Sequence, residues 1–367
     1  MKITVVYASV GAGHRKAAEA IYSCLKEYYS GIDVKLADIL ESSAFFFRFF
    51  YRGGYDFLVR RTHLLWSVVY WLAYFRVSGP LIRAVVSVIN RLCTLRFSSS
   101  LINDGPDVVV STHFLSSEIC AGLRSSGKIN SRIISVVTDF EPHPFWISEG
   151  TGSYVVATQE AAGPLLERGV EPKSIKPLGI PIDPKFSADY KKDELQARFN
   201  LDKNRFTVLV MTGSFGIGPI ETIVDVLCGD FQVLVVCANN NILFERLKEK
   251  NYPRVKVFGF IDTVNELMAV SDIIVTKPGG LTISELLSMD LAPIFISAIP
   301  GQEAENAEAL RKLKIGITAK DAHEVRDRVV FYREHPEALE EVRGNIARIK
   351  RPLAAREICD AICKGSI

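Results

Sequence analysis

A stretch near residue 280 combines the residue types that hold phosphate groups in proteins. It reads Ser271-Asp-Ile-Ile-Val-Thr-Lys-Pro-Gly-Gly-Leu-Thr-Ile-Ser-Glu285, and its pattern predicts a buried strand, Ile273 to Thr276, then a glycine turn and a helix opening at Leu281 or Thr282. Such a junction presents unpaired backbone N–H groups at the positive end of a helix dipole, where an anion binds. A purely structural alternative is a capping box, with Thr282 as the N-cap and Glu285 three residues later.

A glycine loop also follows the first predicted strand of the chain. Residues 2–8 form a short apolar run, and Ser9-Val-Gly-Ala-Gly-His14 comes directly after it. Gly11 and Gly13 let the backbone approach a ligand closely, and the histidine is presented where the next helix starts. A dinucleotide fingerprint needs a third glycine at the position of Lys16, so this loop does not predict NAD binding.

A second loop of this kind, Thr212-Gly-Ser-Phe-Gly-Ile-Gly218, follows the strand predicted over Thr207 to Met211. The carboxyl ends of parallel strands share one edge of a sheet. This loop and the turn at Gly279 and Gly280 can therefore converge on one ligand.

Polar side chains follow two predicted strands in the first half of the chain. The strand over Asp107 to His113 delivers a histidine near its end, and the strand over Ile133 to Asp139 delivers an aspartate. His143 and Trp146 lie in the loop behind the second strand. Their repeated position at strand ends predicts one cleft. For each residue alone, a capped turn or a buried, hydrogen-bonded histidine is the structural alternative.

Predicted strands alternate with helical patterns through both halves of the chain, and this alternation predicts an α/β fold. We predict two doubly wound, Rossmann-like domains, residues 1–180 and 190–350, and a C-terminal helix within 351–367. Turn-formers followed by charged residues over 179–200 mark the boundary. The last helix starts after Pro352, and its apolar face can close either domain. Strands of the second half are predicted at 207–211, 232–237, 254–257, 273–276, 293–296 and 316–318.

The charge balance and the cysteine spacing limit the classes of protein to which the chain can belong. Charged residues make up 23% of the chain and nearly cancel to a net charge of +2, which does not indicate nucleic-acid binding. The seven cysteines include no CxxC pair and no zinc spacing, so we expect free thiols in a reducing cytosol. The chain runs from its first residues into a strand, and we expect no secretory signal.

Residues 42–97 differ from the rest in being crowded with aromatic residues and arginines. Between positions 41 and 100 there are eight arginines and two acidic residues. The longest nearly uninterrupted apolar run, Leu64 to Phe75, is shorter than the ~20 residues that span a bilayer. A helical amphipathic segment in the interface of an anionic membrane fits this composition. The alternative is a buried helical hairpin with snorkelling arginines. Pro80 suits the first turn of a further helix.

With these motifs in this order, the sequence resembles the diacylglycerol glycosyltransferases, the group of plant monogalactosyldiacylglycerol synthases and bacterial processive diacylglycerol glucosyltransferases. These are relatives of the peptidoglycan GlcNAc transferase. The resemblance covers nearly the whole chain and rests on six stretches: Ser9 to Arg15, Val137 to Trp146, Thr212 to Gly216, Gly259 to Ile261, Thr276 to Glu285 and Ile299 to Asn306. It implies the GT-B fold, in which two Rossmann-like domains face a cleft, with a UDP-sugar donor and inversion of the anomeric centre.

The resemblance assigns the donor site to the second domain. Backbone N–H groups at the Gly280 turn, the Thr282 hydroxyl and the Gly213 turn would hold the diphosphate. Glu285 would bind the ribose, and Phe260 with Ile261 would meet the uracil. The implied donor-binding residues are Gly213, Ser214, Phe260, Ile261, Gly279, Gly280, Leu281, Thr282, Glu285, Gln302, Glu303 and Asn306, the last three reading sugar hydroxyls. The chain contains no Asp-x-Asp, so we expect neither a metal nor another cofactor.

Inversion requires a base that takes the proton of the acceptor hydroxyl as it attacks the sugar. His14 is the first choice, since its ordinary pKa lies near working pH. Asp139 is the second, as the base itself or as the group that orients His14. The implied acceptor and lipid contacts are Gly11, Gly13, Arg15, His113, His143, Trp146, Arg48, Arg52, Arg60, Arg61, Trp66 and Trp71. Many plant relatives have three consecutive glycines before the histidine, whereas Ala12 interrupts them here.

We therefore expect transfer of a hexose, glucose or galactose, from UDP-hexose to diacylglycerol. The reaction would take place at the cytosolic face of the cell membrane, on a peripheral or monotopic protein whose partners include anionic lipid and no nucleic acid. One alternative keeps the fold but makes the chain a GlcNAc transferase acting on a polyprenyl-diphosphate lipid. Another is a non-catalytic relative that binds only lipid and nucleotide. The presence of all six stretches argues against that loss of function.

Overall fold

The computed structural model describes residues 1–49, 80–214, 216–296 and 301–367. In the helix that begins at Pro80, the side chains are described from Val86 onward. Chain contacts divide it into two compact units. Unit 1 comprises Met1–Asp183, Ile299–Gln302 and Leu353–Ile367, and unit 2 comprises Pro184–Ala298 and Glu303–Pro352. The chain thus leaves unit 1, builds unit 2, and returns to unit 1 with its last residues.

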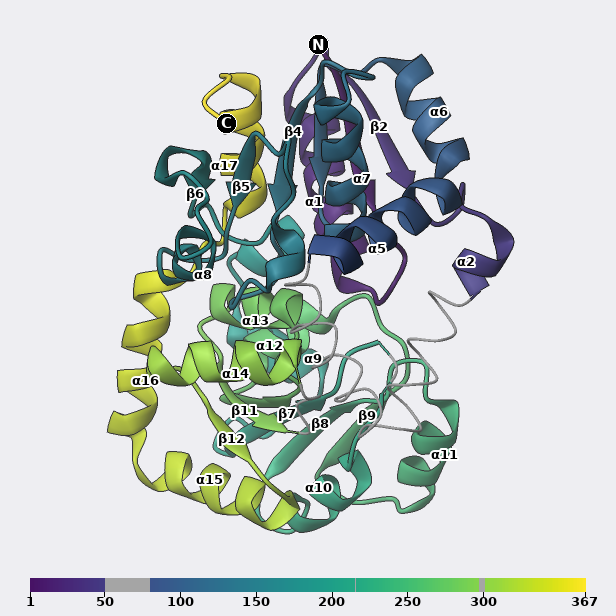
Figure 1. The fold of residues 1–367 in the computed structure, drawn as a ribbon. Coiled ribbons are helices and arrows are strands. Elements are labelled where there is room, and N and C mark those ends of the chain that lie inside the picture. Colours follow the sequence, from purple (N-terminus) through teal and green to yellow (C-terminus); the bar gives the residue numbers. More distant parts are fainter. Residues whose placement is uncertain (50–79, 215, 297–300) are drawn as a thin grey trace. The chain divides into compact units, whose positions relative to one another are not determined.

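Unit 1 is built on a six-stranded parallel sheet with the order β2-β1-β3-β4-β5-β6 (Figure 1). Its strands are β1 (Lys2–Tyr7), β2 (Asp33–Asp38), β3 (Val108–Ser111), β4 (Arg132–Val136), β5 (Ser153–Val155) and β6 (Ile175–Lys176). Buried β-branched residues fill the central strands, as expected for a parallel sheet that is covered on both faces. The strand order reverses between β1 and β3, and open α/β sheets bind ligands at such a point.

Helices cover both faces of this sheet. They are α1 (Gly13–Tyr28), α2 (Phe45–Phe49), α5 (Pro80–Cys93), α6 (Leu95–Asp104), α7 (Phe114–Ser125), α8 (Gly163–Leu166) and α17 (Ala354–Cys363). α1 and α17 pack against Ile3, Val5 and Val110, whereas α6 and α7 pack against Val6 and Val109 on the opposite face. This alternation follows from the two-residue period of side chains along a strand.

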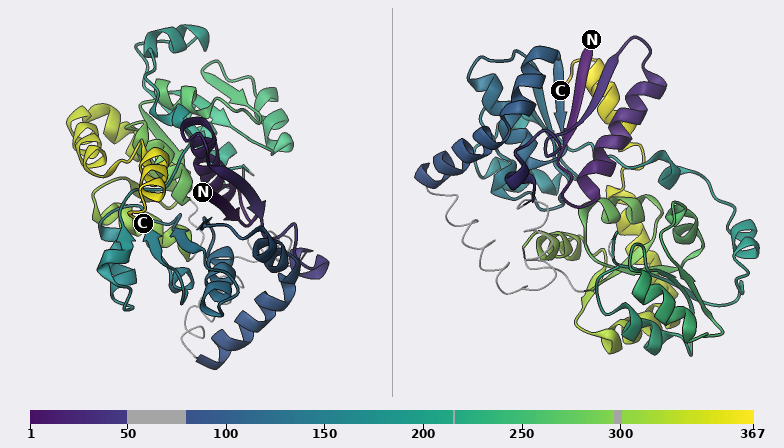
Figure 2. Two further views of the ribbon diagram at one scale, coloured as in Figure 1. Left: turned by 90° about the horizontal axis from the view of Figure 1, so that it is seen from above. Right: turned by 90° about the vertical axis from the view of Figure 1, so that its right-hand side faces the viewer.

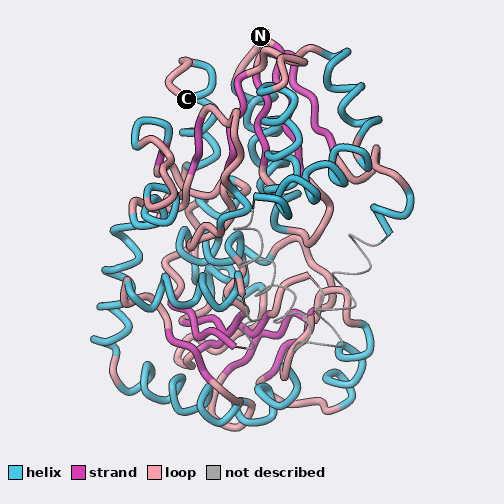
Figure 3. The backbone as a smooth tube through the Cα atoms, viewed as in Figure 1, coloured by secondary structure: helices cyan, strands magenta, loops and turns pink. Residues whose placement is uncertain are grey.

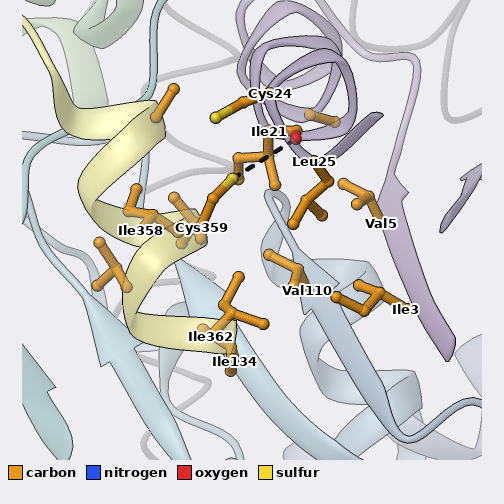
Figure 4. Packing of buried hydrophobic residues seen from close by; sticks show 14 of the residues in the cluster. Ile3, Val5, Ile21, Cys24, Leu25, Val110, Ile134, Ile358, Cys359 and Ile362 are labelled. Carbon is orange, nitrogen blue, oxygen red and sulfur yellow. Dashed lines mark hydrogen bonds between the residues drawn. The ribbon is translucent and has the colours of Figure 1, made fainter. Parts of the chain in front are cut away.

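The last helix, α17, belongs to unit 1. Ile358, Cys359 and Ile362 are fully buried and share one core cluster with Ile21 and Leu25 of α1 (Figure 4). Of the two domains that this helix could have closed, it closes the first.

Unit 2 contains a second six-stranded parallel sheet, with the order β12-β11-β10-β7-β8-β9. Its strands are β7 (Thr207–Met211), β8 (Gln232–Val236), β9 (Val255–Phe258), β10 (Ile273–Thr276), β11 (Ala292–Ile296) and β12 (Ile317–Ala319). The strand order reverses between β7 and β10, which pair directly. This is again the place where a doubly wound sheet binds its ligand.

Helices alternate with the strands of unit 2 and pack on them (Figures 2 and 3). They are α9 (Lys192–Arg198), α10 (Ile220–Leu227), α11 (Asn241–Glu249), α12 (Val264–Val270), α13 (Gly280–Ser288), α14 (Gln302–Lys312), α15 (Ala322–Glu334) and α16 (Pro336–Ile349). Every loop that follows the carboxyl end of a strand therefore leads toward a helix.

The structure confirms the six strands predicted for the second half, within one residue at their ends, and the C-terminal helix. Pro80 is the first residue of α5, as predicted. The prediction missed strands β2 and β6. Of the segment 42–97, residues 50–79 lie outside the described residues, and the described parts hold α2, α5 and the start of α6. In the part of the chain that the structure covers, no helix is long and apolar enough to cross a membrane.

Candidate active site

The histidine of the first glycine loop lies where the strand order of unit 1 reverses. His14 is the second residue of α1, directly after the loop that follows β1, and Thr112 follows the neighbouring strand β3. Two hydrogen bonds tie them together: the Thr112 hydroxyl donates to the His14 carbonyl over 2.8 Å, and Nδ1 of His14 lies 2.8 Å from the Thr112 carbonyl. Gly11 has a φ of +72°, a conformation that favours glycine and lets this loop turn into the helix. Gly13 is the first residue of α1.

These contacts assign the tautomer of His14. A carbonyl oxygen only accepts hydrogen bonds, so Nδ1 carries the proton that points at the Thr112 carbonyl. The Thr138 hydroxyl oxygen lies 2.9 Å from the same Nδ1 and shares that proton. Nε2 is then the unprotonated, basic nitrogen of the ring. The sequence interpretation gave neither Thr112 nor Thr138 a role, although both lie near the ends of predicted strands and Thr138 stands beside Asp139.

Around His14 lies a buried cluster that contains four more of the predicted residues. The rings of His14 and His113 are 4.5 Å apart at their centroids. Trp146, in the short helix η2 (Pro144–Trp146), is fully buried, and its Nε1 donates to Oδ2 of Asp139 over 2.6 Å. Nε2 of His143 lies 3.7 Å from the same oxygen. The fold thus brings together five residues from the ends of β1, β3 and β4.

The histidines of this cluster are neutral at pH 7. Burial lowers the pKa of His14 to about 4, and the hydrogen bond to Thr112 offsets part of that effect. Burial, and then the neighbouring His14, lower the pKa of His143 to about 3. Burial also holds the pKa of His113 well below its ordinary value, with His14 and His143 adding to it. Nδ1 of His113 accepts from the Leu115 backbone N–H.

Asp139 is only 1% exposed and lies against Trp146 and His143. Because Thr112 and Thr138 occupy Nδ1 of His14, a carboxylate contact to His14 would have to use Nε2. Thr112 and Thr138 thus orient His14 through Nδ1, and the role of Asp139, as the base or as a group that orients His14, stays a prediction.

The remaining predicted acceptor residues lie apart from this cluster or outside the described part. Arg15 is exposed and forms an ion pair with Glu19 at 2.7 Å. Arg48 is on α2, with its guanidinium 5.9 Å from the centroid of the Phe45 ring. Five predicted residues lie outside the described residues: Arg52, Arg60, Arg61, Trp66 and Trp71.

Unit 1 also exposes large apolar side chains on two helices, α2 and α5, which are joined by a backbone hydrogen bond. On α2, Phe45, Phe46 and Phe49 are between 63% and 74% exposed. On α5 the exposed residues include Ile89 and Leu92. A hydrogen bond from the Ala44 N–H to the Cys93 carbonyl, 2.9 Å long, ties the start of α2 to the end of α5. Exposed apolar side chains that gather in one region are typical of interaction surfaces.

In unit 2, the predicted phosphate-binding helix begins earlier than expected. α13 starts at Gly280, its N-cap is Gly279, and no side chain caps it. The prediction that the helix opens at Leu281 or Thr282, and the alternative that Thr282 is its cap, are therefore wrong. The backbone N–H groups of Gly280, Leu281 and Thr282 have no hydrogen-bond partner within the described segments. They belong to the first turn, which has no preceding carbonyl to bind.

A second loop lies beside this helix start. Val275 of β10 pairs with Val210 of β7, so the loops after the two strands leave the sheet next to each other. In the loop after β7, Gly213 has a φ of +75° and is followed by Ser214. The Thr212 side chain is 5% exposed, and its hydroxyl has no partner among the residues described. The edge therefore presents several donors at the strand-order reversal.

The other predicted donor residues are divided between α13, α14 and the loop after β9. Glu285 is 6% exposed on α13. Asn306 is 1% exposed on α14, and its amide donates to the Pro278 carbonyl over 3.2 Å, which holds the turn that precedes α13. Gln302 and Glu303 are the first residues of α14, and Phe260 and Ile261 follow β9, the edge strand of the sheet, where Phe260 is 65% exposed. Throughout the described ranges, no group of three or more His, Cys, Asp or Glu residues is placed to hold a metal.

Each unit thus offers its own chemistry. Unit 1 presents an imidazole with a fixed tautomer and a basic Nε2. Unit 2 presents unpaired N–H groups at a helix start, which suit an anionic leaving group.

Comparison with known proteins gives matches over nearly the whole chain. The family described as Monogalactosyldiacylglycerol (MGDG) synthase matches residues 14–182, and the family described as Glycosyltransferase family 28 C-terminal domain matches residues 207–341. The processive diacylglycerol beta-glucosyltransferase of Staphylococcus epidermidis is 33% identical over 278 residues, covering 74% of this chain and 69% of that protein. The protein of the same name from Bacillus pumilus is 26% identical over 372 residues, covering 100% of this chain and 95% of its own.

A solved structure shares the fold at low sequence identity. The crystal structure of HepE from Anabaena in complex with UDP-glucose has a TM-score of 0.57 and 14% identity, covering 99% of this chain and 100% of that one. With two parallel, doubly wound sheets on separate units, the chain has the GT-B fold.

Proposed function

The chain belongs to the family of the processive diacylglycerol β-glucosyltransferases and is a glycosyltransferase, and from this premise we propose that it transfers a hexose from UDP-hexose to the free hydroxyl of diacylglycerol with inversion at the anomeric carbon. The family relatives are named as glucosyltransferases, so glucose is the sugar we propose first. UDP-galactose is the alternative donor.

The observation that carries this proposal is the state of His14. A base that removes the acceptor proton must be neutral before the reaction and must have a free lone pair. The Thr112 carbonyl fixes the His14 proton on Nδ1, which leaves the lone pair of Nε2 available. Burial lowers the pKa of His14 to about 4, so the ring is neutral at pH 7 but is a weaker base than a free imidazole. In the proposed step, Nε2 takes the proton of the diacylglycerol hydroxyl as its oxygen bonds to C1 of the sugar. The bond from C1 to the UDP oxygen breaks, and UDP leaves with the electron pair.

The edge formed by the loops after β7 and β10 supports the other half of the reaction. The leaving UDP carries additional negative charge in the transition state, and donors already in place stabilise it without reorganisation. We propose that the N–H groups of Gly280, Leu281 and Thr282 and the Gly213 turn bind the diphosphate. Glu285 would accept hydrogen bonds from the ribose hydroxyls.

His14→Asn is the sharpest test of the base. Asparagine keeps an N–H for the Thr112 carbonyl but has no basic nitrogen, so transfer should fall by about 10²–10⁴-fold while UDP affinity stays unchanged. His323→Asn, at an exposed position of α15, is the matched control and should behave as the wild type. Near-normal transfer by His14→Asn would show that another group is the base.

The substrates are tested with radiolabelled donors. UDP-glucose, UDP-galactose and UDP-GlcNAc are offered separately with diacylglycerol vesicles, and the lipids are separated by thin-layer chromatography. We expect a labelled glycolipid from UDP-glucose. Label only from UDP-GlcNAc, and only with a polyprenyl-diphosphate lipid, would favour the related GlcNAc transferase activity instead. Absence of UDP release with every lipid would indicate a non-catalytic relative.

We further propose that unit 1 docks on the cytosolic face of an anionic membrane through the exposed side chains of α2 and α5. Phe46 is 74% exposed and Leu92 is 62% exposed, and Arg91 and Arg96 nearby supply positive charge. Phe46→Glu and Leu92→Glu should each reduce co-sedimentation with vesicles that contain phosphatidylglycerol. Leu166→Glu, at an exposed apolar position on α8, should not. Equal loss in all three variants would contradict a specific docking face.

A further inference from the structure

Unit 2 contains a hollow of about 340 Å³ at the edge of its sheet where β7, β8 and β9 begin. Five of the polar residues that line it are Asp202, Arg205, Gln232, Arg254 and Lys256, and we call it the basic hollow. It is formed entirely by residues of unit 2. Neither the proposed transfer nor any of the six sequence stretches involves it.

Positive charge outweighs negative charge in the basic hollow. Of its three cationic side chains, only that of Arg205 has an acidic partner in the described chain, Asp202, with Nε to Oδ2 at 3.0 Å. Arg254 donates to the Gly229 carbonyl, which leaves its charge unbalanced. Lys256 is partly buried on β9, and its side chain forms no hydrogen bond or ion pair with any described residue. Cations gathered in one concavity repel one another, and a bound anion relieves that repulsion.

The wall of the hollow is held in place by its own hydrogen bonds. Gln232 is 6% exposed; its Nε2 donates to the Thr207 hydroxyl and its Oε1 accepts from the Asp202 N–H, each over 2.9 Å. The Asp202 carboxylate also accepts from the Asn204 N–H over 3.0 Å. The loop that carries Arg205 is therefore ordered before any ligand binds, which lowers the entropic cost of binding.

The basic hollow lies where the strands begin, whereas the loops of Gly213 and Gly280 follow the strands where they end. We call that opposite edge of the sheet the nucleotide edge, and the basic hollow is separate from it. A strand rises by about 3.3 Å per residue, so the two ends of β8 are roughly 13 Å apart. A ligand in the hollow therefore does not occupy the place of the donor diphosphate.

We propose that the basic hollow binds a small phosphate-bearing anion. Guanidinium groups match the oxygens of a phosphate in pairs, and a lysine adds a further charged donor. The volume admits a phosphate together with a small organic group. Two sources share this chemistry: free phosphate, and the glycerol phosphate headgroup of an anionic lipid.

Binding is measured on the full chain by isothermal titration calorimetry in saturating UDP, so that the nucleotide edge is already occupied. Inorganic phosphate and sn-glycerol 3-phosphate are titrated separately. We expect saturable one-to-one binding of at least one of them. Tighter binding of glycerol phosphate assigns the lipid headgroup as the source, and equal or tighter binding of phosphate assigns the free anion.

Variants locate the site. Lys256→Gln and Arg254→Gln should each weaken binding by about 10-fold or more, because each removes a charge-assisted hydrogen bond. Lys248→Gln is the matched control, since Lys248 is an exposed lysine of α11 with no acidic partner in the described chain and lies outside the hollow. Failure of both anions to saturate overturns the proposal. So does an affinity that Lys256→Gln and Arg254→Gln leave unchanged, or one that Lys248→Gln lowers as strongly.

Discussion

Thr138 is the residue whose replacement tests how the His14 imidazole is oriented. Thr138→Val removes the hydroxyl 2.9 Å from Nδ1 and leaves the Thr112 carbonyl as the remaining partner. Loss of one hydrogen bond of about 1 kcal/mol should reduce kcat about 5-fold, with the KM for the donor unchanged. Thr138→Ser keeps the hydroxyl and should restore the rate. A rate in Thr138→Ser as low as in Thr138→Val would mean that the methyl group matters and the hydroxyl does not.

The lowered pKa of His14 also predicts how stability changes with pH. The unfolded chain binds a proton to this ring near pH 6.5, whereas the folded chain binds it near pH 4. Between these values the unfolded state holds more protons, so stability decreases as the pH falls. The slope is at most about 1.4 kcal/mol per pH unit for one histidine. Above pH 6.5 the ring contributes no slope.

Urea unfolding of the wild type and of His14→Asn at pH 7.5, 6 and 5 measures this contribution. The variant should show a shallower loss of stability between pH 6 and pH 5 by about 1.4 kcal/mol. His323→Asn, at the exposed position, should keep the wild-type slope. Parallel curves for the wild type and His14→Asn would show that His14 titrates normally in the folded protein.

At the residue scale, the sequence predicted where His14, His113, Asp139, His143 and Trp146 lie better than it predicted what they touch. A glycine loop or a strand end is visible in one stretch of sequence. The partners of His14 come from strands more than 90 residues away, and only the strand order β1-β3-β4 brings them together. A hydroxyl beside a ring nitrogen has no local sequence signal.

At the element scale, the loop after β7 offers two glycines with contrasting constraints. Both have positive φ, +75° at Gly213 and +56° at Gly216. A Cβ at Gly213 would meet nothing within 4 Å, whereas a Cβ at Gly216 would lie 2.3 Å from the Cys237 carbonyl oxygen. Gly213→Ala should therefore cost only the backbone strain, about 1–2 kcal/mol. Gly216→Ala should cost about 1–3 kcal/mol more, because the chain must move.

Urea unfolding of the two variants, followed by far-UV circular dichroism, measures this difference. Equal losses of stability would contradict the close approach of the loop to Cys237. Stability near the wild type in both would show that neither residue needs its left-handed backbone conformation.

Strands covered on both faces were predictable because they are continuous apolar runs, as in β7 and β8. The edge strand β2 was missed for the opposite reason: Asp33–Asp38 alternates charged and apolar residues and is only partly buried. β6 has only two residues. The start of α13 was predicted too late in the sequence, because its N-cap is a glycine and no side chain caps the helix.

At the scale of the whole molecule, α17 closes the core of a unit whose other elements lie more than 170 residues earlier. Ile358 is fully buried in that core. Ile358→Ala should destabilise the protein by about 2–5 kcal/mol. Lys364→Ala, at the exposed end of the same helix, should change stability by less than about 0.5 kcal/mol. Chemical unfolding measures both, and similar values for the two variants would indicate that α17 is not packed in solution.

The return of the chain to unit 1 sets an order of events during synthesis. Domains usually fold as they leave the ribosome, the first one first. Here all the strands of unit 2 are translated before Ala354, where α17 begins. The nascent unit 1 therefore waits with its apolar α1 face uncovered while unit 2 is made and can fold. The first half of the gene would encode the last part of the protein to mature, and chaperones would need to protect it for the time that ~170 codons take to translate.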